Sequence, residues 1–294
     1  MERREILKHG LTGAAILGLS KFSAAHEWFE SGRRWFKIGA CDWSIGMDSK
    51  VEGMELAKKI GLDGLQINMG NEANDLHLRR SEIQQAYKDA AKKFGVRFSG
   101  MGIGELNHVP YKSDPRTEQW VSDSIDVAKA MEIKVILLAF FHKNDLKNDA
   151  AGTKVVIERL KQVAPKAEKM GITLGIESWL SAEEHMHIID AVASENVKVY
   201  YDVCNSEKMG YNIYDEIRWL GKKNQICEFH MKENGFILGT GRVDFKKVRA
   251  AIEDIDYKGW MQIEGAVPQG QPVFESYVKN LNYLRPVFPE TKRG

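Results

Sequence analysis

Short runs of apolar and β-branched residues alternate with longer helical stretches along the chain from Trp35 onward. The apolar runs predict eight strands, at residues 36–41, 64–67, 98–101, 135–138, 173–176, 197–201, 226–230 and 260–263. The stretches between and after them predict eight helices, at residues 51–60, 81–94, 117–131, 153–170, 182–193, 213–220, 245–255 and 272–287. Glycines follow several of these helices directly, at positions 61, 95, 171 and 221, and are typical of helix C-termini.

The predicted strands are almost entirely apolar, which indicates burial on both faces, as in a parallel sheet covered by helices. Alternation of strand and helix is typical of an α/β fold. Eight such units in about 260 residues match the count and size of a closed (β/α)8 barrel. We therefore predict a single TIM barrel domain over residues 35–290.

An open, doubly wound sheet is the alternative α/β fold. Such a sheet usually carries a glycine-rich phosphate-binding turn after its first strand, whereas Asp42-Trp43-Ser44 stands at that position here. The glycine-rich run at residues 100–104 follows the third strand and is more typical of a tight turn at a strand end. These observations favour the closed barrel.

The composition is that of an ordinary globular protein, with 43% hydrophobic and 28% charged residues among 294. Lys and Arg number 42 against 41 Asp and Glu, so the formal net charge is +1. The sequence has no long basic block, which argues against a nucleic-acid partner. Cys41, Cys204 and Cys227 are widely spaced without a C-x-x-C pair, so we interpret them as small buried residues rather than metal ligands or a disulfide framework.

The first 25 residues have the pattern of an export signal. Two arginines at positions 3 and 4 precede a mildly apolar run (residues 10–19), and small residues follow at positions 23–25. Paired arginines ahead of a weakly hydrophobic core are typical of a twin-arginine signal. The run is shorter than the roughly 20 residues of a membrane-spanning helix, so no stable membrane anchor is predicted. We predict a periplasmic or otherwise exported protein, with an amphipathic N-terminal helix as the alternative interpretation.

Four consecutive predicted strands end in an acidic or imidazole side chain: Glu177, Asp202, His230 and Glu264. In a barrel the chemistry lies where the strands end, at the C-terminal face. Because adjacent strands are about 4.8 Å apart, these side chains are expected to converge. Three crowded carboxylates would repel one another and take up protons unless a cation neutralises them. An oxygen-rich set with one imidazole suits Mn²⁺ best, with Mg²⁺, Co²⁺, Fe²⁺ or Zn²⁺ as alternatives.

Each of these residues taken singly has a simpler interpretation. An Asp or Glu that directly follows a strand is often a helix N-cap or a solvated loop residue. His230 alone would more often be a hydrogen-bonded histidine at the barrel rim. It is the recurrence on successive strands that indicates a metal site.

Around these positions the sequence resembles the xylose isomerase-like TIM barrel superfamily, and within it the sugar phosphate isomerase/epimerase group that includes D-tagatose 3-epimerase. The resemblance covers roughly the whole chain after residue 25. The segments that carry it are Ile176-Glu177, Tyr201-Asp202-Val203-Cys204-Asn205, Phe229-His230-Met231-Lys232, Leu238-Gly239-Thr240-Gly241, Val243-Asp244-Phe245 and Gly259-Trp260 ahead of Ile263-Glu264.

The resemblance implies that Glu177, Asp202, His230 and Glu264 hold one divalent ion, commonly manganese. It also implies that Glu177 and Glu264 form an acid–base pair that transfers a proton on opposite faces of the substrate. The ion would hold a carbonyl and an adjacent hydroxyl and stabilise a cis-enediolate, since a cation makes the proton beside a carbonyl more acidic. The predicted activity is a divalent-metal-dependent sugar isomerase or epimerase.

The substrate contacts implied by the resemblance are only partly present. Glu183, six residues after Glu177, occupies the position of a substrate-binding glutamate. Asn205 stands where the epimerases often carry a histidine, and Phe236 stands where they carry an arginine. These departures keep a metal-dependent lyase or hydratase acting on 3-keto-sugars or keto-glycosides as the main alternative.

Other residues that follow predicted strands are candidates for substrate binding. Besides Glu183 and Asn205 they are Trp43, His108, His142 and Lys232, with Gln66, Asn68 and Glu105 at comparable positions. Trp43 would stack on the apolar face of a sugar. His108, His142 and Lys232 would bind hydroxyls or a carboxylate, or carry protons. Packing at the rim is the alternative for each.

Two further functions are weaker alternatives. An endonuclease IV-like enzyme would need a histidine-rich zinc site and a basic groove, and the sequence indicates neither. A non-catalytic sugar-binding barrel would keep the site without turnover. The expected partner is a small sugar or sugar derivative. The sequence leaves open which sugar it is, whether it is phosphorylated, and whether the chain forms a homo-oligomer.

Overall fold

The computed structural model describes residues 33–34, 36–289 and 291–292. The predicted export signal, residues 1–25, lies outside the described residues. The chain divides into two compact units, one of residues 35–290 and one of residues 1–34 together with 291–294. In the smaller unit, β1 (Arg33–Arg34) pairs antiparallel with β10 (Thr291–Lys292).

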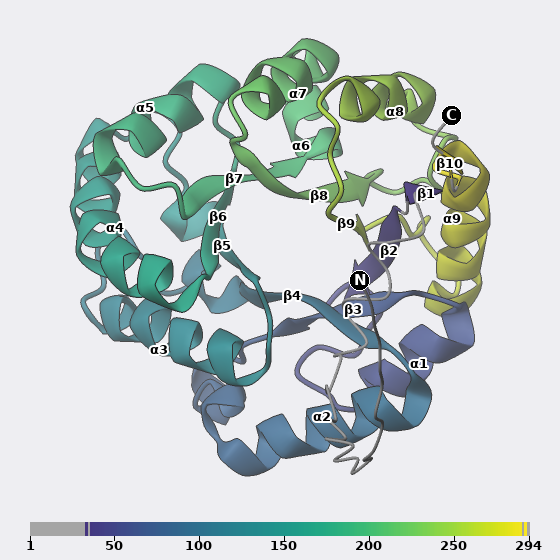
Figure 1. Cartoon of the computed structure of the whole chain (residues 1–294), viewed down its shortest axis with the longest axis horizontal. Coiled ribbons are helices and arrows are strands. Elements are labelled where there is room, and N and C mark those ends of the chain that lie inside the picture. The colour runs from purple at the N-terminus through teal and green to yellow at the C-terminus, as the bar shows by residue number, and fades with distance from the viewer. Residues whose placement is uncertain (1–32, 35, 290, 293–294) are drawn as a thin grey trace, which may run out of the picture. The chain divides into compact units, whose positions relative to one another are not determined.

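The larger unit is a closed barrel of eight parallel strands in the order β2-β3-β4-β5-β6-β7-β8-β9, surrounded by helices (Figure 1). The strands are β2 (Lys37–Cys41), β3 (Gly64–Asn68), β4 (Arg97–Ile103), β5 (Val135–Phe140), β6 (Thr173–Ser178), β7 (Val197–Asp202), β8 (Ile226–Lys232) and β9 (Trp260–Glu264). β9 pairs with β2 from Lys37↔Trp260 to Ala40↔Ile263, which closes the barrel. The predicted TIM barrel is thus confirmed.

The outer layer consists of helices that alternate with the strands. They are α1 (Gly53–Ile60), α2 (Ser81–Phe94), α3 (Arg116–Ala130), α4 (Ala150–Met170), α5 (Ala182–Val192), α6 (Val203–Lys208), α7 (Ile213–Lys222), α8 (Phe245–Asp254) and α9 (Val273–Val287). Short 3₁₀ turns lie in the loops: η1 (Glu72–Asn74), η2 (His77–Arg79), η3 (Gly104–Asn107) and η4 (His142–Asn144). The short helix α6 and these turns were not predicted, because each is too short to produce a hydrophobic periodicity.

The ends of three helices follow the glycine signals, and the end of a fourth does not. Gly61, Gly95 and Gly171 have φ of 93°, 66° and 67° and terminate α1, α2 and α4 in the left-handed conformation. The predicted end of α7 at Gly221 is wrong, because this helix continues to Lys222. A Cβ at Gly221 would lie 2.3 Å from the side chain of Ile255. Glycine is therefore needed there for close packing rather than for termination.

The inside of the barrel combines apolar side chains with buried polar ones. Leu137, Ala139 and Tyr200 form a small apolar cluster of their own. Beside it, Glu228 is buried and accepts a hydrogen bond from the Tyr200 hydroxyl at 3.0 Å and from Gln262 Nε2 at 3.4 Å. Burial raises the pKa of Glu228 to about 8, so this carboxyl is largely protonated at neutral pH.

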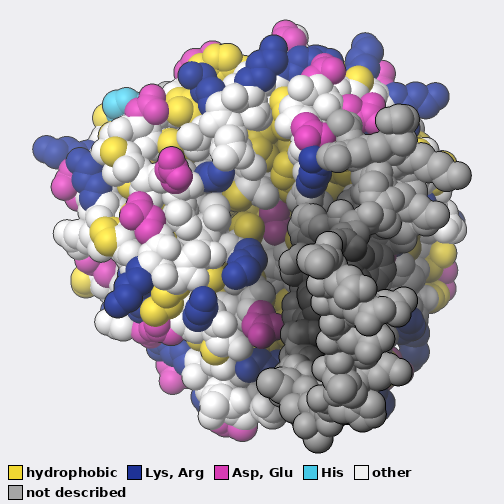
Figure 2. Space-filling model, in the orientation of Figure 1, with side chains coloured by type: hydrophobic (Ala, Val, Ile, Leu, Met, Phe, Trp, Pro, Cys, Tyr) yellow, Lys and Arg dark blue, Asp and Glu magenta, His cyan; other side chains and the backbone are white. Residues whose placement is uncertain are grey.

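The surface mixes both signs of charge. In the orientation of Figure 1, Lys and Arg side chains lie among Asp and Glu side chains over the coloured part of the visible face (Figure 2). Within the described part of the chain, none of the helices is both long enough and apolar enough to cross a membrane.

Candidate metal centre

The four predicted metal ligands stand at the C-terminal ends of four adjacent strands. Glu177 lies in β6, Asp202 ends β7, His230 lies in β8 and Glu264 ends β9. The parallel register pairs Asp202 with His230 across β7 and β8, and pairs Lys232 with Glu264 across β8 and β9. These strands run one or two residues beyond their predicted ends, so the ligand candidates belong to the barrel itself and are held by its backbone ladder.

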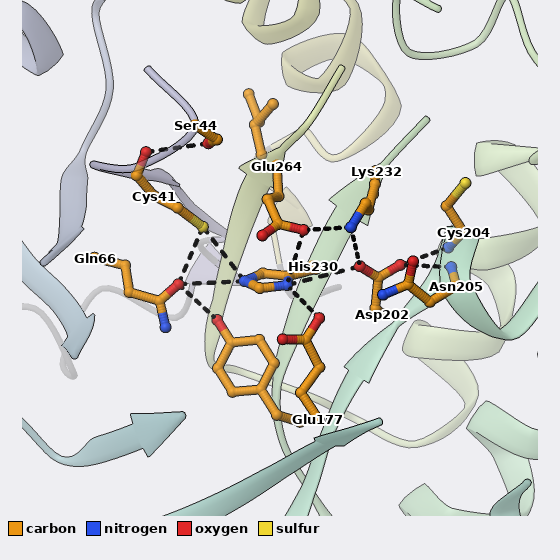
Figure 3. A network of polar contacts seen from close by, with 12 residues as sticks. Cys41, Ser44, Gln66, Glu177, Asp202, Cys204, Asn205, His230, Lys232 and Glu264 are labelled. Carbon is orange, nitrogen blue, oxygen red and sulfur yellow. Dashed lines mark hydrogen bonds and ion pairs between the residues drawn. The ribbon is translucent and has the colours of Figure 1, made fainter. Parts of the chain in front are cut away.

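The four side chains converge on one point, as Figure 3 shows. His230 Nδ1 lies 2.9 Å from Glu177 Oε1, 3.5 Å from Glu264 Oε2 and 3.7 Å from Asp202 Oδ2. One donor atom from each of the four residues lies within 4.8 Å of the corresponding atoms of the others. We call this group, Glu177, Asp202, His230 and Glu264, the carboxylate–histidine cluster.

The two carboxylate oxygens of Asp202 have different partners. One accepts hydrogen bonds from the backbone, and the other faces the cluster. Its Oδ1 accepts from the backbone N–H groups of Cys204 and Asn205, both at 2.8 Å, and so caps α6. Its Oδ2 is buried without a hydrogen-bond partner and lies 3.4 Å from Lys232 Nζ. The capping interpretation of Asp202 and the ligand interpretation are thus compatible. The cap orients the carboxylate and leaves the second oxygen available to a cation.

The charges of the cluster are balanced by its neighbours. Burial alone would raise the pKa of Glu264, but Lys232, whose Nζ lies 2.7 Å from Oε2, and His230 together lower it to about 2. Burial raises the pKa of Glu177 to about 7, against the opposing effect of His230. Burial would lower the pKa of His230, yet the carboxylates of Glu177 and Glu264 raise it well above its usual value. Three carboxylates in one buried site therefore depend on nearby positive charge.

The Nε2 side of the His230 ring contacts polar side chains inside the barrel. Its Nε2 lies 3.2 Å from Gln66 Oε1 and 3.3 Å from Cys41 Sγ. Since an amide oxygen only accepts, it favours a proton on Nε2. Nδ1 is then the ring nitrogen that faces the carboxylates and that would bind a cation in place of a proton. Burial raises the pKa of Cys41 to about 12, so the thiol stays protonated and donates to Gln66 Oε1 at 3.1 Å. Cys41 is buried, as predicted, but lies directly against the cluster.

The donor set fits a divalent cation. It offers three carboxylates and one imidazole nitrogen at mutually close range, and it includes a buried carboxylate oxygen of Asp202 that lacks a hydrogen bond. Oxygen-rich ligation with a single histidine suits Mn²⁺ and related hard or borderline ions. Glu177, Asp202, His230 and Glu264 are thus the residues that would hold the ion.

A cavity of about 450 Å³ opens beside the cluster. Glu177 and Glu264 are among its lining residues, whereas Asp202 and His230 are not, and all of the cluster except Glu264 is almost completely buried. The structure brings most of the predicted substrate-binding residues to this cavity, namely Trp43, His108, His142, Asn205 and Lys232. Trp43 Nε1 also donates to Glu264 Oε1 at 2.8 Å, which ties this side chain to the cluster.

The structure does not bring Glu183 to the cavity. It lies exposed in the first turn of α5, where its Oε2 accepts a hydrogen bond from the Ser181 hydroxyl at 3.1 Å. Its neighbour Glu184 accepts from the Ser181 backbone N–H and pairs with Lys147 Nζ at 2.6 Å. The capping box at the start of α5 uses Glu184 as the partner of Ser181 and leaves Glu183 on the exposed side of the first turn.

Several cavity residues were missed from the sequence. The unpredicted ones include Asp48, Asn71, Asn107, Phe141 and Trp179. Trp179 stands two residues after Glu177 and could have been found as an aromatic residue just past a strand end. Phe141 directly follows β5 and could have been found in the same way. Asp48, Asn71 and Asn107 lie between strands and helices, in segments whose course the sequence pattern does not indicate.

The loop that follows β6 and carries Trp179 toward α5 is fastened by a buried histidine. His185 Nε2 lies 2.9 Å from the Ser178 hydroxyl, and its Nδ1 lies 2.9 Å from the Ser181 carbonyl oxygen. Burial lowers the pKa of His185 from 6.5 to about 4. The folded protein therefore holds this ring neutral at a pH where the unfolded chain protonates it.

We expect His185 to make stability depend on pH. Its contribution is fully present above about pH 6.5 and is lost as the pH falls toward 4, because the unfolded state binds the extra proton. Between pH 7.5 and 4.5 this loss is about 2–3 kcal/mol. Urea unfolding at the two pH values should show a correspondingly smaller decline for His185→Asn. His187→Asn, an exposed position on the same helix, is the control. An unchanged decline in His185→Asn would contradict the prediction.

Comparison with known proteins identifies the family. The profile of the xylose isomerase-like TIM barrel family matches residues 54–287. The chain belongs to this family. The match spans the region from α1 to α9 and includes all four residues of the carboxylate–histidine cluster.

Similar proteins include several sugar epimerases. The chain is 23% identical over 235 residues to D-psicose 3-epimerase of Enterocloster bolteae, covering 74% of this chain and 77% of that protein. Among solved structures, D-psicose 3-epimerase from Clostridium cellulolyticum H10, crystallised with D-tagatose, has a TM-score of 0.73 at 19% identity and covers 86% of this chain and 99% of that one. The 3-keto-D-glucoside 4-epimerase from E. coli has a TM-score of 0.71 at 15% identity, covering 86% and 100%. At these identities the structural likeness concerns the fold.

Proposed function

We propose that this protein is a divalent-metal-dependent sugar isomerase or epimerase that moves a proton at a carbon beside a carbonyl group. The observation that carries the proposal is the position of Glu177 and Glu264. Of the four cluster residues, these two line the cavity, and they come from β6 and β9, at the two ends of the row of four ligand-bearing strands. A substrate carbon held at the cluster would therefore lie between the two carboxyl groups.

The neighbours of these two carboxyls hold them in place. Glu264 receives hydrogen bonds from Trp43 and Lys232, and Glu177 lies against His230 Nδ1. One carboxylate can take the proton from the substrate carbon while the other returns a proton to it. Each would act on the face of that carbon that it contacts. A bound divalent cation would supply the positive charge that makes the proton acidic and stabilises charge developing on the substrate oxygens. The epimerase relatives support sugars as the substrate class.

Isotope exchange tests this proposal directly. Purified protein supplied with Mn²⁺ would be incubated in D₂O with free ketoses and with 3-keto-glycosides, and followed by NMR. We expect deuterium at the carbon beside the carbonyl and conversion to the epimer or isomer without bond cleavage. Binding of sugars without any deuterium incorporation would contradict the proposal and favour a sugar-binding barrel.

A lyase or hydratase is the second candidate, and the positions of two histidines favour it. His108 and His142 line the same cavity from the β4 and β5 loops, away from the cluster. Elimination needs a proton donor for the leaving oxygen in addition to the base, and an imidazole on the far side of the substrate provides one. In the exchange experiment, release of a β-oxygen substituent from a 3-keto-glycoside would identify this reaction.

Export to the periplasm remains a prediction from residues 1–25.

A further inference from the structure

The carboxylate–histidine cluster lies at one side of the cavity. The cluster occupies the ends of β6 to β9, whereas residues from the loops after β3, β4 and β5 line the remainder of the mouth. Its volume of about 450 Å³ lies within the range of about 300–1,000 Å³ that encloses drug-sized ligands. A single hexose is smaller than such a ligand. A sugar ring held at the cluster would therefore leave the β4–β5 side of the cavity free.

An aromatic wall made of Phe141 and His142, which follow β5, and Trp179, which follows β6, borders this free side. Trp179 meets Phe141 edge to face with ring centroids 5.3 Å apart, and meets His142 at 6.3 Å. All three line the cavity, and Trp179 and Phe141 are only partly buried. The C–H face of a pyranose ring is apolar and packs on such a surface, so aromatic side chains exposed in a cavity that also carries carboxylates and amides suit a ring-shaped ligand.

The aromatic wall is held in a defined position. The Trp179 carbonyl oxygen accepts a hydrogen bond from the Tyr211 hydroxyl at 2.9 Å. The Phe141 N–H donates to Asn107 Oδ1 at 3.0 Å. His142 has a φ of 51°, a left-handed conformation that non-glycine residues adopt infrequently and that is often found at functional sites. These contacts preorganise the wall before any ligand binds.

A second tryptophan stands on the other side of the barrel mouth. Trp43 follows β2 and Trp179 follows β6, and three strands separate β2 from β6 in either direction around the closed barrel. Trp43 is hydrogen-bonded to Glu264 and so belongs to the cluster side. The cavity thus has one aromatic side chain at the cluster and another group of them opposite.

The charge of the cavity lining argues against a phosphate group on the part of the ligand that occupies the free side. Among the described residues that line the cavity, Lys232 is the only Lys or Arg, and it is paired with Glu264 and Asp202. The same lining contains Asp48 and Glu105 in addition to the cluster glutamates. These carboxylates and the nearby Asn68 suit hydroxyl groups, whereas an anionic ligand would be repelled.

We propose that Phe141, His142 and Trp179 form a second ring subsite, and that the substrate is a neutral glycoside of two rings rather than a free or phosphorylated monosaccharide. One ring lies at the cluster and reacts, and the second, joined through the glycosidic bond, stacks on Trp179. This inference rests on the proposed function for the identity of the reacting ring. The second subsite can be tested separately, because it concerns the affinity for a ligand and not its turnover.

Calorimetry with Mn²⁺-supplied protein tests the subsite without relying on turnover. The probes are methyl glucoside and glucose disaccharides, each also as its 3-keto derivative. Two-ring ligands are expected to bind about tenfold or more tightly than the matching methyl glycosides. Trp179→Ala should remove this advantage and change one-ring affinity by less than about twofold, while Trp179→Phe should restore most of it. Trp219→Ala, at an exposed position on α7 outside the cavity, is the matched control.

Several results would overturn the subsite: equal affinity for one-ring and two-ring ligands, equal weakening of both by Trp179→Ala, or tighter binding of a glycoside phosphate than of its neutral form. Failure of the proposed function looks different. In that case two-ring selectivity and its dependence on Trp179 persist, while no deuterium enters any ligand.

Discussion

Replacing Glu177 or Glu264 with glutamine is expected to reduce turnover by about 10²–10⁴-fold, the usual contribution of a positioned acid or base. Glutamine keeps the size of the side chain but cannot accept or return a proton. Because the two carboxyls reach the cavity from β6 and β9, the first and last strands of the cluster, each should act on one face of a substrate carbon held between them. Each variant is therefore expected to retain deuterium exchange with one epimer and lose it with the other. Exchange rates for both epimers, measured separately by NMR, check this.

Two controls make the result interpretable. Metal content has to be measured for each variant, since an amide is a weaker ligand than a carboxylate. Glu183→Gln makes the same chemical change at an exposed residue outside the cavity, and its activity is expected to stay within about twofold of the unmodified protein. Full activity of both Glu177→Gln and Glu264→Gln would refute their acid–base roles. Strong loss in Glu183→Gln would restore the role that family resemblance implied for that residue.

The barrel and the cluster were predictable for a common reason. Strands buried on both faces leave a continuous apolar run, so the polar residue that ends each run stands out in the sequence. Glu177, Asp202, His230 and Glu264 were visible in this way, and the parallel register then places such ends at one rim. The convergence of side chains from β6 to β9 follows from topology, which the alternation of strands and helices indicates.

The surroundings of the cluster were not predictable in the same way. Gln66 could be named as a rim residue, but its contact with His230 joins β3 to β8 across the barrel and depends on side-chain geometry. The choice between Glu183 and Glu184 depends on the capping box of α5, which spacing from Glu177 does not reveal. Phe141 and Trp179 meet only because the β5 and β6 loops adopt particular conformations. Non-local contacts of this kind leave no periodic signal.

Stripping bound metal with a chelator is expected to reduce turnover by about a thousandfold or more and to leave the barrel folded. A cation at the developing charge contributes several kcal/mol, and each ~1.4 kcal/mol is a factor of ten in rate. The fold should survive because Lys232 and His230 already offset the carboxylates, and because the backbone ladder holds the strand ends. Turnover and far-UV circular dichroism, measured before chelation, after it and after Mn²⁺ is restored, test both parts.

Metal binding should nevertheless stabilise the folded state measurably. At a metal concentration one hundred times the dissociation constant the contribution is about 2.7 kcal/mol, or roughly 5–10 °C in the unfolding temperature of a domain of this size. Asp202→Asn should abolish most of this shift, since the buried Oδ2 has no hydrogen-bond partner in the cluster. Glu228→Gln, at a buried carboxyl inside the barrel that is largely protonated, is the matched control and should keep it. A fully active metal-free protein, or an equal shift in Asp202→Asn, would mean that these four side chains do not act together on one cation.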